Sequence, residues 1–163
     1  MYLFETWRRN NTKPMFLAGL LWLIFTQFGY ALPPDTVQIT PESTEAGQSS
    51  IYQIQFSLEQ EILPNAAIIV NFPAAFDLSG VLIAGSATIN GGFQVTVNGT
   101  TVTIKRSGLG KTIKANQKVD VRFANVKNPT TPAASYAVQV QVQNGNNVKI
   151  VDKTQAVRID QKQ

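Results

Sequence analysis

Apolar and polar residues alternate with a period of two along most of the chain after residue 31. This spacing is typical of β-strands, because successive side chains of a strand point to opposite faces of a sheet. Ile69 adds an apolar residue between Ile68 and Val70, so we expect this run to be a central strand covered on both faces. The expected inward-facing residues are Val37, Ile39, Tyr52, Ile54, Phe56, Leu58, Ile68, Val70, Phe72, Phe93, Val95, Val97, Val102, Ile104, Val119, Val121, Phe123, Tyr136, Val138, Val140, Val142, Val148, Ile150, Val157 and Ile159.

Turn signals separate these alternating runs. Asn98-Gly99 is typical of a two-residue hairpin of type I′, in which both central residues have positive φ. The Asn-Gly-Asn-Asn segment at 144–147 predicts a second hairpin loop, and residues 73–80 could form one helical turn. Eight or nine short strands joined in this way predict an all-β protein, an antiparallel β-sandwich.

The first 31 residues have the order of a secretory leader. Basic residues precede an apolar run at 15–25, and the small residues Gly29 and Ala31 stand at positions −3 and −1 of a cut after Ala31. We therefore expect a signal peptide helix at residues 1–31 and one domain at residues 32–163. The apolar run is shorter than the roughly 20 residues of a spanning helix, and an uncleaved anchor is the alternative reading.

Composition narrows the possible chemistry, because the chain contains no histidine and no cysteine. This excludes Ser-His triads, cysteine nucleophiles and metal sites built on imidazole or thiolate. Ser107 lies near Lys105 and Lys111, but its Gly-Leu-Gly surroundings are typical of an ordinary loop. We expect no enzyme activity, no metal site and no cofactor.

The other candidate groups have plain structural interpretations. Carboxylates that lie close in sequence are expected to be solvated, and the two tyrosines retained after the leader are expected to pack rather than stack on sugars. The amide-rich loop at 144–147 offers calcium only uncharged oxygens. These groups are Glu42 with Glu45, Glu59 with Glu61, and Tyr52 with Tyr136.

Charge is unevenly distributed. Residues 32–104 contain six acidic and no basic residues, whereas residues 105–163 contain eleven basic and three acidic residues. Five of these bases form a candidate patch for an anionic ligand: Lys105, Arg106, Lys111, Lys114 and Lys118. Such a patch could bind an anionic polysaccharide or envelope polymer, whereas nucleic acid is disfavoured by the scarcity of exposed aromatics. The competing interpretation is that these charges only keep the protein soluble.

The opposite charges of the two halves also allow head-to-tail self-assembly. In that hypothesis the uncharged segment AVQVQVQ at residues 137–143 is an exposed edge to which another strand could add.

Three segments carry a family resemblance: IIVNFPAAF at 68–76, VDVRFANVKNP at 119–129, and the following SYAVQVQV. Together they resemble immunoglobulin-like β-sandwich modules of large secreted and cell-surface proteins of bacteria and archaea. The resemblance implies a non-catalytic structural or adhesive module, secreted or at the cell surface, with the periplasm not excluded. The partners it implies are other surface or matrix proteins, or copies of the chain itself.

Overall fold

The computed structural model describes residues 36–163, and the expected signal peptide at 1–31 lies outside this range. The described chain folds into nine strands, with one short 3-10 turn at Gly145–Asn147. No helix in this part of the chain is long and apolar enough to span a membrane. The strands are β1 (Thr36–Pro41), β2 (Ser49–Ser57), β3 (Ala67–Asn71), β4 (Ala84–Gly85), β5 (Phe93–Asn98), β6 (Thr101–Arg106), β7 (Val119–Lys127), β8 (Ala133–Asn144) and β9 (Val148–Ile159).

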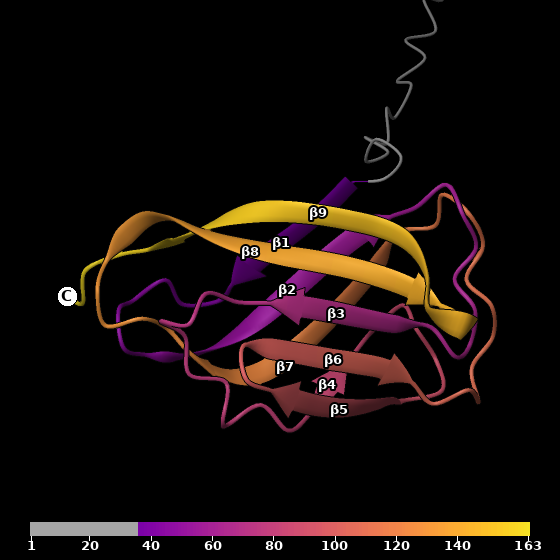
Figure 1. The fold of residues 1–163 in the computed structure, drawn as a ribbon, viewed down its shortest axis with the longest axis horizontal. Coiled ribbons are helices and arrows are strands. Elements are labelled where there is room, and N and C mark those ends of the chain that lie inside the picture. The colour runs from indigo at the N-terminus through magenta and orange to yellow at the C-terminus, as the bar shows by residue number, and fades with distance from the viewer. Residues whose placement is uncertain (1–35) are drawn as a thin grey trace, which may run out of the picture. The chain divides into compact units, whose positions relative to one another are not determined.

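The strands form two antiparallel sheets, which confirms the expected β-sandwich (Figure 1). One sheet has the order β1-β2-β7-β4 and the other the order β5-β6-β3-β8-β9. The chain passes repeatedly between the layers, and at the end of β9 Asp160 forms a parallel bridge with Glu45 of the segment after β1. As the apolar run predicted, β3 is central, with β6 on one side and β8 on the other.

Three local expectations need correction. The segment at 137–143 is not a free edge, because β8 is paired with β3 along one side and with β9 along the other. Residues 73–80 form turns rather than a helical turn, with Phe76 N–H donating to Pro73 and Val81 N–H to Leu78. Val148 is 57% exposed rather than inward-facing, at the first position of β9 directly after the β8–β9 turn.

The hairpin between β5 and β6 is present, but its turn is displaced by one residue. Asn98 pairs with Thr101, so the two loop residues are Gly99 and Thr100. Gly99 has a φ of 56° and Thr100 is not among the residues with positive φ. Positive φ at the first loop position alone corresponds to a type II′ turn, not to the expected type I′ turn.

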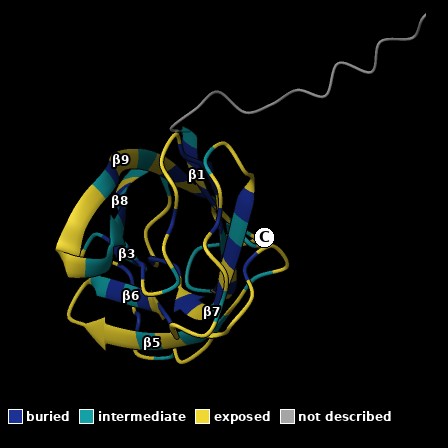
Figure 2. Ribbon diagram, turned by 90° about the vertical axis from the view of Figure 1, so that its right-hand side faces the viewer, coloured by how far each residue is buried: buried dark blue, intermediate teal, exposed yellow. Residues whose placement is uncertain are grey.

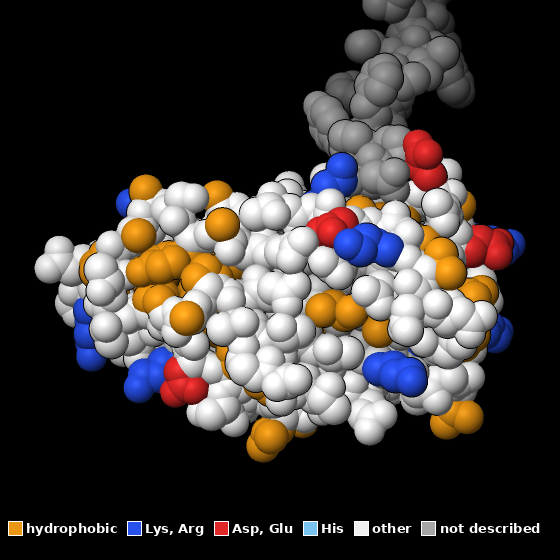
Figure 3. All heavy atoms as spheres, viewed as in Figure 1, with side chains coloured by type: hydrophobic (Ala, Val, Ile, Leu, Met, Phe, Trp, Pro, Cys, Tyr) orange, Lys and Arg blue, Asp and Glu red, His pale blue; other side chains and the backbone are white. Residues whose placement is uncertain are grey.

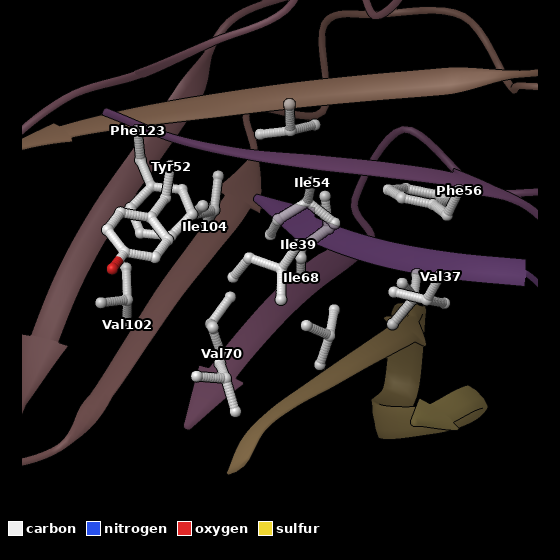
Figure 4. Close-up of a cluster of buried hydrophobic side chains, with 14 of the residues drawn as sticks. Val37, Ile39, Tyr52, Ile54, Phe56, Ile68, Val70, Val102, Ile104 and Phe123 are labelled. Atoms are coloured by element: carbon white, nitrogen blue, oxygen red, sulfur yellow. The ribbon is translucent and has the colours of Figure 1, made fainter. Parts of the chain in front are cut away.

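The core fills the space between the sheets, with inward-facing side chains contributed by both (Figure 4). Its aromatic part joins the layers at one end, where the ring of Phe72, directly after β3, lies 5.4 Å from that of Tyr52 and 6.2 Å from that of Phe123. Phe76 packs on the same cluster, with its ring centroid 5.0 Å from that of Phe72. The period-two pattern therefore identified the main core residues correctly.

Asn128 is a buried polar residue that fixes the loops at this end. The Tyr52 hydroxyl donates to its side-chain oxygen at 2.6 Å, and its amide nitrogen donates to the carbonyls of Ser43 and Glu45. Burial raises the pKa of the Tyr52 hydroxyl well above its usual value. Each polar group of this buried pair is therefore hydrogen-bonded, as a stable core requires.

Candidate functional site

The five basic residues of the predicted patch do not share one surface. Lys105 points outward from β6 on the five-stranded sheet, where it borders a hollow of about 410 Å³ together with Thr103 and Gln143. Lys111, Lys114 and Lys118 are exposed on the loop between β6 and β7. Proximity in sequence thus overstated how closely the five charges lie in space.

Arg106 does not belong to the exposed patch at all, since only 3% of its surface is accessible. Its guanidinium donates to the carbonyl oxygens of Ile62 at 3.1 Å, Leu63 at 2.7 Å and Lys111 at 2.6 Å. Nε has no hydrogen-bond partner, and desolvation lowers the pKa of the group. Arg106 is therefore a structural anchor that ties the β2–β3 loop to the loop after β6.

Two of the remaining lysines border a polar groove beside Thr88. Lys118 lines a hollow of about 390 Å³ over the four-stranded sheet, and Lys111 lines an adjacent hollow of about 280 Å³. Ala87 and Thr88 contribute to both hollows, so the two lie on either side of this segment. Asp120 is the acidic side chain among these lining residues.

Side-chain hydrogen bonds hold the wall of this groove in place. Thr88 Oγ1 accepts from Asp120 N–H at 2.9 Å and lies 3.1 Å from the Asp120 carboxylate. Ser86 Oγ donates to the Asp120 carbonyl and accepts from the N–H groups of Thr88 and Ile89. The wall of the groove is thus preorganised, with Lys111 and Lys118 at its rim.

A second ordered surface is the outer face of the five-stranded sheet. Strand register places on it Ala67, Ile69, Asn71, Gln94, Thr96, Asn98, Thr101, Thr103, Lys105, Ala137, Gln139, Gln141, Gln143, Asp152, Thr154 and Ala156. Most of these side chains are amides, hydroxyls or small apolar groups. Figure 3 views this face and shows a mainly uncharged surface with few blue or red groups at its centre.

Hydrogen bonds cross four strands of this face without interruption. Thr101 Oγ1 donates to Asn71 Oδ1 at 2.6 Å, and the Asn71 amide donates to Gln139 Oε1 at 2.9 Å. Gln139 and Gln141 in turn donate to the two carboxylate oxygens of Asp152, at 2.7 and 3.3 Å. Lys149 Nζ also donates to Asp152 at 2.7 Å, and hydrogen bonding to Lys149 lowers the pKa of that carboxyl. The polar side chains are therefore held in fixed orientations before anything binds.

The remaining sequence candidates are used structurally. Ser107 Oγ donates to the carbonyl of Gly91, so it is tied into its own loop. Asn144, in the amide-rich loop, accepts from Leu63 N–H and donates to the Glu61 carbonyl. Tyr136 donates to the Thr131 carbonyl. Among residues 36–163, no group of three or more acidic side chains is placed to hold a metal ion.

Two buried polar residues were missed as anchors by the sequence interpretation. Arg106 continues the inward row of Val102 and Ile104 at a spacing of two, and this spacing was the available signal for its burial. Asn128 stands before Pro129, and in the sequence this position indicates only a conformational preference. Asn128 follows the alternating run of β7, so the pattern of that strand does not indicate that its amide is buried.

Comparison with known proteins adds evidence on the fold. No protein-family model and no curated protein matches the sequence. The cohesin module of a family 33 glycoside hydrolase from Clostridium perfringens superposes with a TM-score of 0.54 at 14% identity, over 78% of this chain and 96% of the module. The N-terminal domain structure of a Streptococcus gordonii adhesin superposes with a TM-score of 0.52 at 11% identity, over 80% of this chain and 33% of that chain.

These likenesses show that the chain has the fold of immunoglobulin-like β-sandwich modules found in bacterial surface proteins. The resemblance drawn from the Phe-Pro and Asn-Pro segments is thereby confirmed at the level of the fold. A shared fold does not specify function, so the role of this chain has to be argued from its own surfaces.

Proposed function

We propose that this protein is a non-catalytic structural or adhesive module, secreted or held at the cell surface. It contacts other surface or matrix proteins through the outer face of its five-stranded sheet. The leader pattern at residues 1–31 supplies the route of export in this proposal.

The hydrogen-bonded side-chain network across β6, β3, β8 and β9 is the observation that carries the proposal. A free polar side chain loses rotamer entropy when a partner immobilises it, at a cost of about 0.5–1.5 kcal/mol each. Asn71, Gln139 and Gln141 are already restrained by their neighbours, so binding would cost less for them. The low charge of the face also limits the desolvation cost of a broad protein contact.

The comparisons with solved structures also support a role as a non-catalytic module. One neighbour is a cohesin module of a glycoside hydrolase and the other is a domain of an adhesin. Neither name describes a catalytic unit. Together with the absence of histidine and cysteine from this chain, this favours a contact function over an enzymatic one.

Two glutamines allow a matched test, because Gln141 lies on the outer face of the five-stranded sheet and Gln38 on that of the four-stranded sheet, outside the groove beside Thr88. Fluorescently labelled protein is added to intact producing cells, before and after protease treatment of their surface. We expect saturable binding that protease removes, weakened about tenfold by Gln141→Lys and unchanged by Gln38→Lys. Absence of saturable binding, or equal loss in both variants, would contradict the proposal.

The groove beside Thr88 favours a second candidate function, binding of an anionic polysaccharide. Lys111 and Lys118 border adjoining hollows, and Lys114 projects from the same loop. Electrostatic attraction along such a groove acts on any polyanion of suitable width and weakens as salt is added.

Polygalacturonate is a suitable probe for this second function. In affinity electrophoresis we expect it to retard the protein at low salt and not at high salt. The double variant Lys111→Glu with Lys118→Glu should lose the retardation, whereas Lys153→Glu with Lys162→Glu, which makes the same change of net charge elsewhere, should keep most of it. Equal loss in both double variants would show that only net charge matters and would remove this candidate.

A further inference from the structure

The two sheets have four lateral edges, and three of them carry features that discourage strand addition. β1 ends in Pro41 and is bridged beyond its end, where the segment that follows it meets Asp160. β4 is only two residues long. β9 carries Lys149, Asp152, Lys153 and Arg158, and its pairing with β8 is interrupted by two register shifts. Short length, charge, proline and bulges are the usual protections of an edge.

β5 has none of these protections. Its sequence FQVTVN contains no charge and no proline, and its pairing with β6 runs without a register shift. Figure 2 shows β5 as largely exposed, beside the more buried β6. No hydrogen bond from its backbone to any segment other than β6 occurs in the described residues.

The hydrogen-bond phase of β6 identifies which backbone groups of β5 are unpaired. Arg106 N–H donates to Ala66 of the segment leading into β3, and Ser107 N–H donates to the Gly92 carbonyl. Bonding therefore alternates along β6, and Lys105, Thr103 and Thr101 bond to Gln94, Thr96 and Asn98 of β5. The N–H and C=O groups of Phe93, Val95 and Val97 consequently point away from the sheet.

We propose that two copies of this chain associate by antiparallel pairing of β5 with β5, with Val95 opposite Val95 of the second copy. This register pairs all three residues with outward backbone groups, because Phe93 then lies opposite the second copy's Val97. Each facing pair exchanges N–H···O bonds in both directions. The two five-stranded sheets become one continuous sheet around a two-fold axis.

Side-chain chemistry is self-complementary in this register. The residues that face the core side, Phe93, Val95 and Val97, meet only one another, and on the outer side Gln94 meets Thr96. Val97 is 37% exposed although it belongs to the inward row, because no strand lies beyond β5. Pairing with a second copy covers this apolar surface.

Further apolar surface lies beside the same edge. Leu82 and Ile83, directly before β4, are 76% and 66% exposed, and β4 runs close to β5. Figure 3 shows hydrophobic side chains protruding at the lower margin of the molecule, the margin along which β5 runs in Figure 1. A second copy is the favoured occupant. In an antiparallel pair the uncharged β5 of one copy meets the uncharged β5 of the other, and the apolar residues beside each strand lie next to the same interface.

The absence of cysteine allows the register to be tested directly. Facing residues of a hydrogen-bonded pair have Cα atoms about 5.5 Å apart, within the disulfide range. Under mild oxidation we expect Val95→Cys to form a disulfide-linked dimer. Val97→Cys should not, because the two copies of residue 97 are about 13 Å apart in this register. Cross-linking of neither variant, or of both to the same extent, would overturn the proposed register.

Sedimentation of the wild-type protein tests association without any cross-link. We expect the monomer to give way to a dimer between micromolar and millimolar concentration, and Val97→Lys to remain monomeric because it places two charges in the pairing. Gln38→Lys adds the same charge to β1, on the other sheet, and should dimerise like the wild type. A wild-type protein that stays monomeric throughout, or a Val97→Lys variant that dimerises equally, would refute the pairing. Circular dichroism confirms that each variant is folded.

Discussion

The outer faces of the two sheets differ in how their polar groups are held. On the five-stranded sheet, Asn71, Gln139 and Asp152 belong to one hydrogen-bonded network that crosses the strands. On the four-stranded sheet, Arg122 forms only loose ion pairs, 3.8 Å from Glu42 and 3.9 Å from Asp120. Exposed ion pairs of this kind contribute little to stability and order few groups.

Beside Arg122, the four-stranded sheet also has an apolar hollow of about 250 Å³ lined by Ile51, Ile83, Ala84 and Phe123. The comparison shows that one sandwich can present a face ordered by a network across its strands and a face whose side-chain order is confined to the wall around Thr88. In the proposed function, the five-stranded face is the contact surface because its side chains need little further ordering. The four-stranded face is the natural control in experiments that test this difference.

The largest expected effect is a loss of folding stability, which would disrupt both faces together. Phe72→Ala deletes a ring that follows β3 of one sheet and packs on Tyr52 and Phe123 of the other, and should destabilise the protein by about 3–5 kcal/mol. Urea unfolding followed by circular dichroism measures this loss. A midpoint equal to that of the wild type would show that the aromatic cluster does not join the layers.

Arg106→Met should lower the stability less than Phe72→Ala does. It also tests whether the groove beside Thr88 and the outer face of the five-stranded sheet act independently. The methionine cannot donate to the Lys111 carbonyl, and loss of the donor to a buried acceptor costs about 1–3 kcal/mol. The carbonyls of Ile62 and Leu63 keep the backbone N–H donors of Ile113 and Ala66. We expect lower stability and weaker polygalacturonate retardation, because the lysine loop loses its anchor. Binding to cells should persist at temperatures where the variant is folded, and its loss there would contradict the separation of the two surfaces.

Tyr52→Phe tests the buried polar pair through pH. The folded protein raises the pKa of the Tyr52 hydroxyl, so the unfolded chain loses this proton first as the pH rises above about 10. The stability contributed by the neutral hydroxyl is therefore complete below that pH and declines above it, towards the pKa of the folded state. Unfolding curves from pH 8 to 12 should decline less steeply in the variant. Parallel curves would show that Tyr52 does not cause the decline.

Asp152→Asn should have the smallest effect on the fold. It removes the charge that binds Lys149 and weakens the acceptor shared by Gln139 and Gln141, at an exposed position. We expect an unchanged urea midpoint with weaker binding to cells. Glu42→Gln, which removes the ion pair with Arg122 on the opposite face, should change neither quantity.

The sequence predicted the layers of this fold better than its surfaces. Period-two alternation located Tyr52, Phe72 and Val121 in the core because burial on one face of a strand leaves that trace. Alternation says nothing about which strands become neighbours, so the uncharged segment at 137–143 was wrongly taken for an edge. Charge clustering failed at Arg106 because its position in the inward row, rather than its charge, determines where it lies.

The most direct test of the central proposal asks which face touches the partner on living cells. A photoactivatable benzophenone amino acid is placed at Gln141 on the five-stranded sheet or at Gln38 on the four-stranded sheet, and cell-bound protein is irradiated. The account predicts a covalent adduct with a surface protein from position 141 and none from position 38. Adducts from position 38 alone, from both positions equally or from neither would contradict it.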